Sequence, residues 1–189
     1  MRGLFLALGM TAALSGCGSL NYNLAPEKFD VGALQPGSAI VIVSGGAPQH
    51  CISAGTTMTI APAGSGFAKN GIVGINVDSY VYKSDFTDHF GNLSVFQIKP
   101  GRYELYPYVL NPYLSQTKIP KAEFSAESGD VLYIGEFFAP IACGPGETRI
   151  EIRDMADRDL DLLRARNHAF SSMHIVKRLA TFTGYVGDP

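Results

Sequence analysis

The sequence predicts a mainly β protein, an antiparallel β-sandwich of the Ig-like or transthyretin-like kind with about seven or eight strands and a short C-terminal helical segment. Short runs of β-branched and aromatic residues alternate with turns in a chain that has 21 glycines and 11 prolines. Charged residues crowd together only in the C-terminal part, where apolar residues recur near helical spacing. The length of 189 residues is enough for one domain with a sizeable core.

The predicted strands are short and are separated by turn residues. The first, at 38–43, is a β-branched run that stops at Gly45 and Gly46. Alternation of polar and apolar residues, or a continuous apolar run, predicts the others. They lie at 58–61, 71–82, 94–98, 103–106, around Phe124, 131–137 and 148–152.

The clearest local signal is the turn Lys99-Pro100-Gly101-Arg102 between the runs 94–98 and 103–106. Proline presets the φ of a turn, and glycine supplies a positive φ at no steric cost. We therefore expect these two runs to pair as a hairpin.

A helix is predicted over 156–167. Asp157 and Asp159 near its start and Arg164 and Arg166 near its end suit the helix dipole. Beyond it the pattern is open, because 173–181 fits a short helix whereas 174–176 fits a strand. Residues 184–189 are expected to form a frayed tail.

The N-terminus begins with Arg2, an apolar run at 4–14 and then Leu14-Ser15-Gly16-Cys17. The run is too short for a membrane-spanning helix, which needs roughly 20 residues. The pattern resembles the lipobox of bacterial lipoproteins. That resemblance implies a signal peptide at 1–16, a diacylglycerol thioether on Cys17 and usually a further acyl chain such as palmitate on its amine.

Two other interpretations of this N-terminus stay open, an ordinary secretory signal with Cys17 as a bystander and a buried helix of a cytosolic protein. Under the lipoprotein interpretation, Gly18 and Ser19 are not the acidic residues that retain enterobacterial lipoproteins in the inner membrane. We therefore expect an outer-membrane anchor facing the periplasm. Residues 17–37 would form the lipidated N-terminus and a tether, and 38–183 the folded domain.

The two remaining cysteines, Cys51 and Cys143, would then lie in an oxidising compartment where disulfides persist. We predict that they pair, and closing a loop of about 90 residues would stabilise the fold by up to roughly 4–5 kcal/mol. The alternatives are two unpaired thiols or, less in keeping with the absence of a C-x-x-C motif, a redox site.

The order of these parts resembles a family of uncharacterised bacterial lipoproteins that carry a small sandwich domain of the DUF2846 type. The resemblance implies a fold and a compartment, but it transfers no catalytic residues. It depends on the lipobox and on three motifs: Ile98-x-Pro100-Gly101-x-Tyr103-x-Leu105, Gly129 to Gly135, and Asp154 with Arg158, Asp159 and Leu160.

One cluster has the residue types of a catalytic or metal site. Asp85, Asp88 and His89 lie together in one segment, with Ser84 beside them. The alternative is a polar loop between two strands, which gathers such residues without chemistry. No G-x-S-x-G elbow and no zinc-ligand spacing is present, so the sequence predicts no catalytic set, no metal site and no cofactor.

The best candidate binding surface is aromatic. Tyr106, Tyr108 and Tyr113 follow one another closely, interleaved with prolines. Tyrosine offers an apolar face with a polar tip, which suits sugars or partner proteins. In the alternative interpretation, alternate tyrosines simply pack one face of the sheet.

The leading hypothesis for function is a non-enzymatic, membrane-anchored module that binds an envelope protein or glycan. The alternatives are a periplasmic hydrolase or metal-binding enzyme that uses Asp85, Asp88 and His89, and a small-molecule carrier. The net charge of −2 and the absence of a basic stripe argue against nucleic-acid binding.

Overall fold

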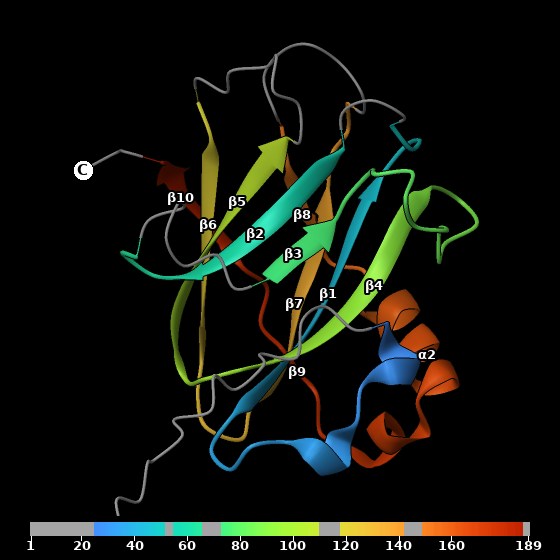
Figure 1. The fold of residues 1–189 in the computed structure, drawn as a ribbon, viewed down its shortest axis with the longest axis vertical. Coiled ribbons are helices and arrows are strands. Elements are labelled where there is room, and N and C mark those ends of the chain that lie inside the picture. The colour runs from blue at the N-terminus through green and yellow to red at the C-terminus, as the bar shows by residue number, and fades with distance from the viewer. Residues whose placement is uncertain (1–24, 52–54, 66–72, 110–117, 142–148, 187–189) are drawn as a thin grey trace, which may run out of the picture.

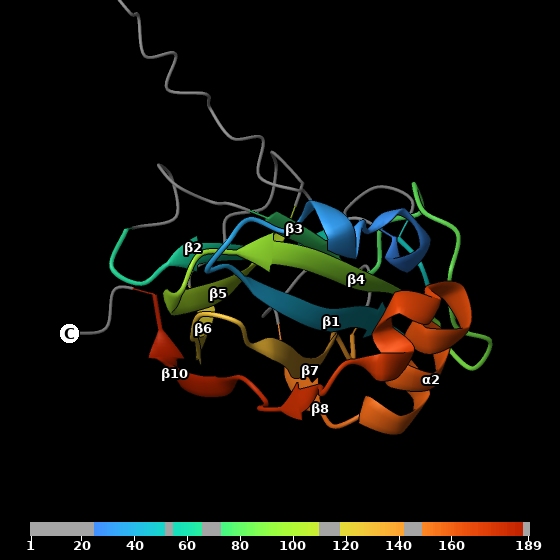
Figure 2. The same ribbon diagram turned by 90° about the horizontal axis from the view of Figure 1, so that it is seen from below.

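The computed structural model describes residues 25–51, 55–65, 73–109, 118–141 and 149–186. Two β-sheets pack face to face, and the helical elements lie against the outer side of one of them (Figures 1 and 2). The first sheet has the order β4 (Phe90–Ile98), β1 (Ala39–Ala47), β7 (Val131–Phe138) and β8 (Glu151–Arg153), with β9 (Val176–Lys177) also paired to β7. The second has the order β10 (Thr181–Tyr185), β6 (Pro120–Ala126), β5 (Gly101–Val109), β2 (Thr56–Pro62) and β3 (Val73–Asn76).

The predicted sandwich with a C-terminal helix is confirmed, although the first sheet is mixed. β1 pairs with β4 in the antiparallel sense but with β7 in the parallel sense, and β7 and β9 are also parallel. The pairs of the second sheet are all antiparallel. Every residue of β1 is buried, as expected of a strand that lies inside a sheet covered on both faces.

Two apolar clusters cover the two faces of the first sheet. Val41 and Val43 of β1 point into the core between the sheets. Ile40 and Ile42 point outward, into a second cluster beneath the helical layer. Successive strand residues point to opposite faces, so β1 supplies both clusters at once.

The predicted hairpin around Pro100 and Gly101 is wrong. β4 ends and β5 begins at this turn, but β4 pairs with β1 whereas β5 pairs with β2 and β6. The turn therefore carries the chain from one sheet to the other. A Pro-Gly signal sets the bend of the backbone, and it does not select the strand beside which the next run will lie.

The N-terminal tether is shorter than predicted, because part of residues 17–37 belongs to the folded domain. Two short 3₁₀ helices, η1 (Pro26–Lys28) and η2 (Val31–Ala33), begin the described chain. Phe29 is buried with its ring centroid 5.8 Å from that of Phe170. The Asn167 side-chain amide donates to the carbonyls of Pro26 and Phe29, both at 2.9 Å.

Helix α2 (Ala156–Arg166) agrees with the helix predicted over 156–167. Its inward face buries Ala156, Asp159 and Leu163. The 3₁₀ helix η3 (His168–Ser172) follows, and then β9, so the helix over 173–181 did not form. β10 includes Gly184 and Tyr185, so the part of the predicted frayed tail at 184–185 is ordered strand, and 187–189 lie outside the described residues.

The two cysteine predictions remain predictions, because Cys17 and Cys143 lie outside the described residues. Cys51 is buried, with its sulfur 3.2 Å from Oδ2 of Asp78. Over the ranges given above, the structure contains no helix that is long and apolar enough to cross a membrane.

Candidate functional site

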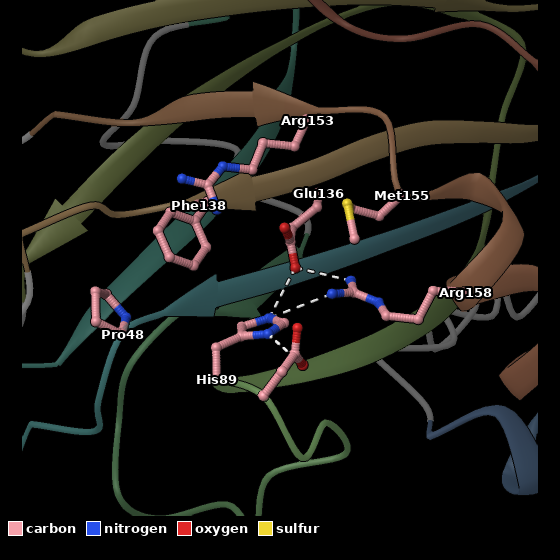
Figure 3. Close-up of a pocket in the computed structure, with 8 residues that line it drawn as sticks. Pro48, His89, Glu136, Phe138, Arg153, Met155 and Arg158 are labelled. Atoms are coloured by element: carbon pink, nitrogen blue, oxygen red, sulfur yellow. Dashed lines mark hydrogen bonds and ion pairs between the residues drawn. The ribbon is translucent and has the colours of Figure 1, made fainter.

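A pocket of about 340 Å³ opens where the C-terminal ends of β1 and β7 meet the start of α2 (Figure 3). Because β1 and β7 are parallel, both deliver their last residues to the same edge of the sheet. We call this hollow the His89 pocket. Its lining residues are Pro48, Asp88, His89, Glu136, Phe138, Arg153, Met155 and Arg158.

His89 is held between two carboxylates. Its Nδ1 lies 2.8 Å from Oδ1 of Asp88, and its Nε2 lies 2.9 Å from Oε1 of Glu136. Its ring stacks on Phe86 at a centroid distance of 4.9 Å and meets the edge of Phe138 at 5.7 Å. Both carboxylate contacts are hydrogen bonds at the same time only when each ring nitrogen carries a proton. The hydrogen bond from His89 lowers the pKa of Asp88 below its ordinary value.

Arg158 joins Glu136 to α2. Its Nη2 donates to Oε1 of Glu136 at 2.8 Å and to Oδ1 of Asp159 at 2.7 Å, and its Nε donates to the same Asp159 oxygen at 2.9 Å. The guanidinium lies 3.8 Å from the ring centroid of Phe86. Burial alone would lower the pKa of Arg158, but the hydrogen bonds and charges of Glu136 and Asp159 raise it. The guanidinium is therefore a fixed cation.

Asp159 is fully buried and fastens α2 to the first sheet. Its Oδ2 accepts hydrogen bonds from Ser44 Oγ at 2.5 Å and from the hydroxyl of Tyr133 at 2.8 Å. Burial raises the pKa of Asp159, and the hydrogen bonds from Ser44, Arg158 and Tyr133 act against that rise. Burial also raises the pKa of Tyr133, so its hydroxyl stays a donor. The network thus fixes where Arg158 sits at the pocket.

A β-bulge aims Glu136 into the pocket. The register between β1 and β7 shifts between the pairs Ile42–Tyr133 and Ser44–Glu136, next to Gly135, which has a φ of +109°. Before the bulge, Leu132 and Ile134 point into the core between the sheets. Strict alternation would send Glu136 into that same core. The extra residue reverses the alternation, so Glu136 points outward and the apolar residue after it points inward.

Gly46 allows the close approach on which the pocket depends. A Cβ at this position would lie 2.8 Å from two atoms of the His89 ring and 3.2 Å from Oε1 of Glu136. The pair Gly45-Gly46, which the sequence suggests as the end of the first strand, instead lies within β1, which continues to Ala47.

The structure divides the predicted cluster of Asp85, Asp88 and His89. Asp85 accepts from the Leu93 backbone at 2.9 Å and pairs with Arg166 at 2.7 Å, so it ties its loop to β4 and α2. Ser84 bonds to backbone groups of the same loop and to those of Gly91 in β4. Only Asp88 and His89 reach the pocket. In the part of the chain that is described, no three His, Cys, Asp or Glu residues group as metal ligands.

The predicted tyrosine surface is not assembled as expected. Tyr106 is only 3% exposed, and its hydroxyl donates to Glu104. Burial is the main cause that raises the pKa of Tyr106, and the hydrogen bond to Glu104 raises it further. The prediction is wrong for Tyr106, because the side chain lies under cover on the outer side of the second sheet. Tyr108 is 39% exposed, and Tyr113 lies outside the described residues.

Sequence reasoning missed most of the pocket. Glu136 lies within an apolar strand run, and Asp159 lies on the same helix face as buried Leu163. A charged residue at a position that should be buried is the signal that identifies such sites. Arg158 could have been found only as the partner that two buried carboxylates require.

No family model, no curated protein and no solved structure matches the chain. The site is therefore defined by its geometry alone. It is a polar pocket at the end of a β-sandwich, with a buried ion network behind it and an apolar wall of Pro48, Phe138 and Met155. A concave site with an apolar wall and a few oriented polar groups is the usual form of a ligand pocket.

Proposed function

We propose that this chain is a lipid-anchored lipoprotein of the bacterial envelope, and that its sandwich domain binds another envelope component, a protein or a glycan, through the His89 pocket without catalysis. The observation that carries the proposal is the double engagement of His89 by Asp88 and Glu136. A general base needs a ring nitrogen within reach of the substrate proton. Here each nitrogen already faces a carboxylate oxygen.

The hydrolase alternative is weaker for a second reason. Ser44, the only serine hydroxyl in the described network behind the pocket, is fully buried and bonded to Asp159. A nucleophile must be exposed and adjacent to its base. The pocket instead has features that suit recognition: a rigid polar floor, and a rim where Asp88 is 67% exposed.

The anchor in this proposal is the lipid on Cys17, and the packing of η1 bears on how far the domain would reach. Only seven residues separate Cys17 from Ala25, the first described residue. Fully extended, such a segment spans at most roughly 25–30 Å. The domain would then work close to the membrane surface, and we place that surface at the periplasmic side of the outer membrane because Gly18 and Ser19 are not acidic.

The anchor is tested by growing cells with an alkyne analogue of palmitate. The wild-type chain should take up the label and sediment with membranes, whereas Cys17→Ser should lose the label. Ser19→Ala is the control, because it changes a neighbouring small residue and keeps the cysteine. Labelling of the Cys17→Ser variant would contradict the anchor.

The pocket is tested by photocrosslinking in the native envelope. A photoreactive residue at Met155, on the pocket wall, should capture a recurrent partner. The same residue at Tyr108, on the second sheet, is the matched control. Capture at Tyr108 alone would move the binding surface to the tyrosines, and capture at neither would contradict a macromolecular partner and favour a small-molecule ligand.

A further inference from the structure

We infer that the group recognised in the His89 pocket is a primary ammonium on an aliphatic stem, such as a lysine side chain presents. This inference rests on the proposed function, because it names the chemistry of the occupant of the same pocket. Two observations carry it: an unpartnered oxygen of a buried carboxylate, and the balance of charge around it.

The unpartnered oxygen is Oε2 of Glu136. The side chain is only 1% exposed, and both of its contacts, from His89 and from Arg158, go to Oε1. No described residue donates a hydrogen bond to Oε2. Every fully enclosed side-chain oxygen or nitrogen among the described residues has a hydrogen-bond partner, so Oε2 is not one of the enclosed atoms. Oε2 therefore reaches the open space of the pocket. In Figure 3 it is the oxygen without a dashed line, on the side of Phe138.

A carboxylate oxygen in such a position is a strong site for a hydrogen-bond donor. An ionised acceptor forms charge-assisted hydrogen bonds, which are roughly twice as strong as those between neutral groups. Because the rest of the Glu136 side chain is enclosed, the free lone pairs of this oxygen are available only from the pocket. A donor on a ligand would complete the hydrogen bonding of the carboxylate.

The charge balance selects a cationic donor. Three carboxylates, those of Asp88, Glu136 and Asp159, surround one guanidinium and one imidazole. The other arginine of the pocket, Arg153, is paired with Glu151, whose Oε2 accepts from it at 2.7 and 3.1 Å. Even with His89 protonated, the negative charges outnumber the positive ones. A cation would balance the site, whereas a neutral hydroxyl would not and an anion would be repelled.

The arginines do not make this an anion site. Nε and Nη2 of Arg158 are committed to Glu136 and Asp159, and its Nη1 lies 3.5 Å from His89. The guanidinium of Arg153 lies over the ring of Phe138, with its central carbon 3.4 Å from the ring centroid. That stacking occupies a face of Phe138 on which a sugar ring could have rested.

The shape of the pocket also favours a stem with a charged tip. Pro48 and Met155 give it an apolar wall, and Asp88 gives its rim a second, exposed carboxylate. A lysine-like group can lay its methylenes against the wall while its ammonium donates to Glu136, and the carboxylate of Asp88 adds negative charge at the rim.

Isothermal titration of the purified full-length protein in detergent tests the inference. The probe is Nα-acetyl-lysine methylamide, and the matched control is Nα-acetyl-norleucine methylamide, which has the aliphatic stem without the ammonium. Glucosamine and glucose form a second pair that tests an ammonium on a sugar ring, and acetate tests an anion. We expect the lysine compound to bind at least about tenfold more tightly than each of the others, as hydrogen bonds to charged groups imply.

Variants locate the binding. Glu136→Gln should weaken binding of the lysine compound by about tenfold or more. Asp88→Asn should weaken it by about twofold to fivefold, because the charge of this exposed side chain is screened by solvent. Glu127→Gln makes the same chemical change in the turn before β7, at the end of that strand away from the pocket, and should leave binding unchanged. Asp88 is exposed, so Asp88→Asn keeps the test valid even if Glu136→Gln unfolds.

Equal binding of the norleucine compound, tighter binding of acetate or of a sugar, or no binding of the lysine compound would each overturn the ammonium inference. Photocrosslinking at Met155 separates this failure from failure of the proposed function. Capture at Met155 without amine binding would reject only the ligand class, whereas loss of both would reject the pocket as a binding site.

Discussion

The two faces of the first sheet are built on different principles. The face toward the second sheet is closed by apolar side chains, among them Val41, Val43 and Phe96. The face toward α2 starts in the same way, with Ile40 and Ile42, but at the pocket end it becomes a network of buried charges and hydroxyls. The first face stabilises the fold without specifying a site. The second face also buries polar and charged groups that must be held in fixed orientations, which is typical of a functional region.

The same comparison applies within one strand. In β1, Val41 and Val43 face the core, whereas Ser44 faces outward and donates to Asp159. In β7, a bulge at Gly135 was needed to turn Glu136 away from the core. The sandwich therefore provides the scaffold, and a few local exceptions to its alternation create the pocket.

The largest expected effect comes from removing the centre of the polar network. Asp159→Ala would leave Arg158 with one carboxylate fewer and would leave Ser44 and Tyr133 without their acceptor. Breaking a buried ion pair in this way costs about 3–5 kcal/mol. Urea unfolding followed by circular dichroism measures the loss.

The matched control for that variant is Asp161→Ala. Asp161 lies two residues further along α2, its side chain is 82% exposed, and its pairing with Arg164 is loose at 3.8 Å. A change of less than about 0.5 kcal/mol is expected at such a position. If the two variants lost equal stability, the polar face would not be a stabilising network.

The bulge gives the next prediction. Gly135→Ala places a side chain at a φ of +109° and brings its Cβ to 3.0 Å from Ile152. Strained backbone of this kind costs of order 1–3 kcal/mol. We expect a lower urea midpoint of unfolding and reduced capture by a photoreactive residue at Met155, because the side chain of Glu136 would no longer point into the pocket.

Gly129→Ala separates the effect of backbone strain from the effect of the direction in which Glu136 points. Gly129 also has a positive φ, +84°, but a Cβ there meets nothing within 4 Å, and it lies in the turn before β7. It should lose stability and keep capture at Met155. Loss of capture in both variants would show that general destabilisation, rather than the bulge, explains the result.

The smallest expected effect concerns a buried carboxylate that lacks the cation that Asp159 has. Asp78 accepts from the Thr56 backbone, and within the described ranges no Lys, Arg or His pairs with it. Burial raises its pKa above the ordinary 3.8. The folded state therefore binds a proton at Asp78 more tightly than the unfolded state does. The stability that this site contributes is fully present below about pH 3.8 and is lost as the pH rises through the pKa of the folded state.

Asp78→Asn removes that titration while keeping the side-chain shape. The variant should gain stability relative to the wild type at pH 7, and the gain should shrink as the pH falls toward 4. Urea midpoints at both pH values measure it. A gain that grew on acidification would contradict a raised pKa at Asp78.

Much of the architecture could be predicted, because alternation and turn residues are local signals. The runs that became β7 and α2 were predicted to within one residue of their bounds, whereas β1 continues four residues beyond its predicted end, to Ala47. That β4 and β5 belong to different sheets was not predicted, because the sheet that a strand joins depends on contacts with residues far away in the sequence. The length of the tether was predicted wrongly for the same reason, because Phe29 contacts Phe170 only in the folded chain.

The site was harder to predict than the fold. Asp88 and His89 were recognised because they are neighbours in the sequence, whereas their partner Glu136 is 47 residues away from His89. The same proximity wrongly included Asp85, which the fold pairs with Arg166 instead. Tyr106 was taken for a surface residue, although both faces of its strand are covered at that point.

The most direct test of the account is capture by a photoreactive residue at Met155 in two backgrounds, Glu136→Gln and Glu127→Gln, compared in intact cells at matched expression. If the His89 pocket is the binding site, capture should fall strongly in Glu136→Gln and remain at the wild-type level in Glu127→Gln. Equal capture in both backgrounds would contradict the central claim, because the buried carboxylate would then play no part in holding the partner.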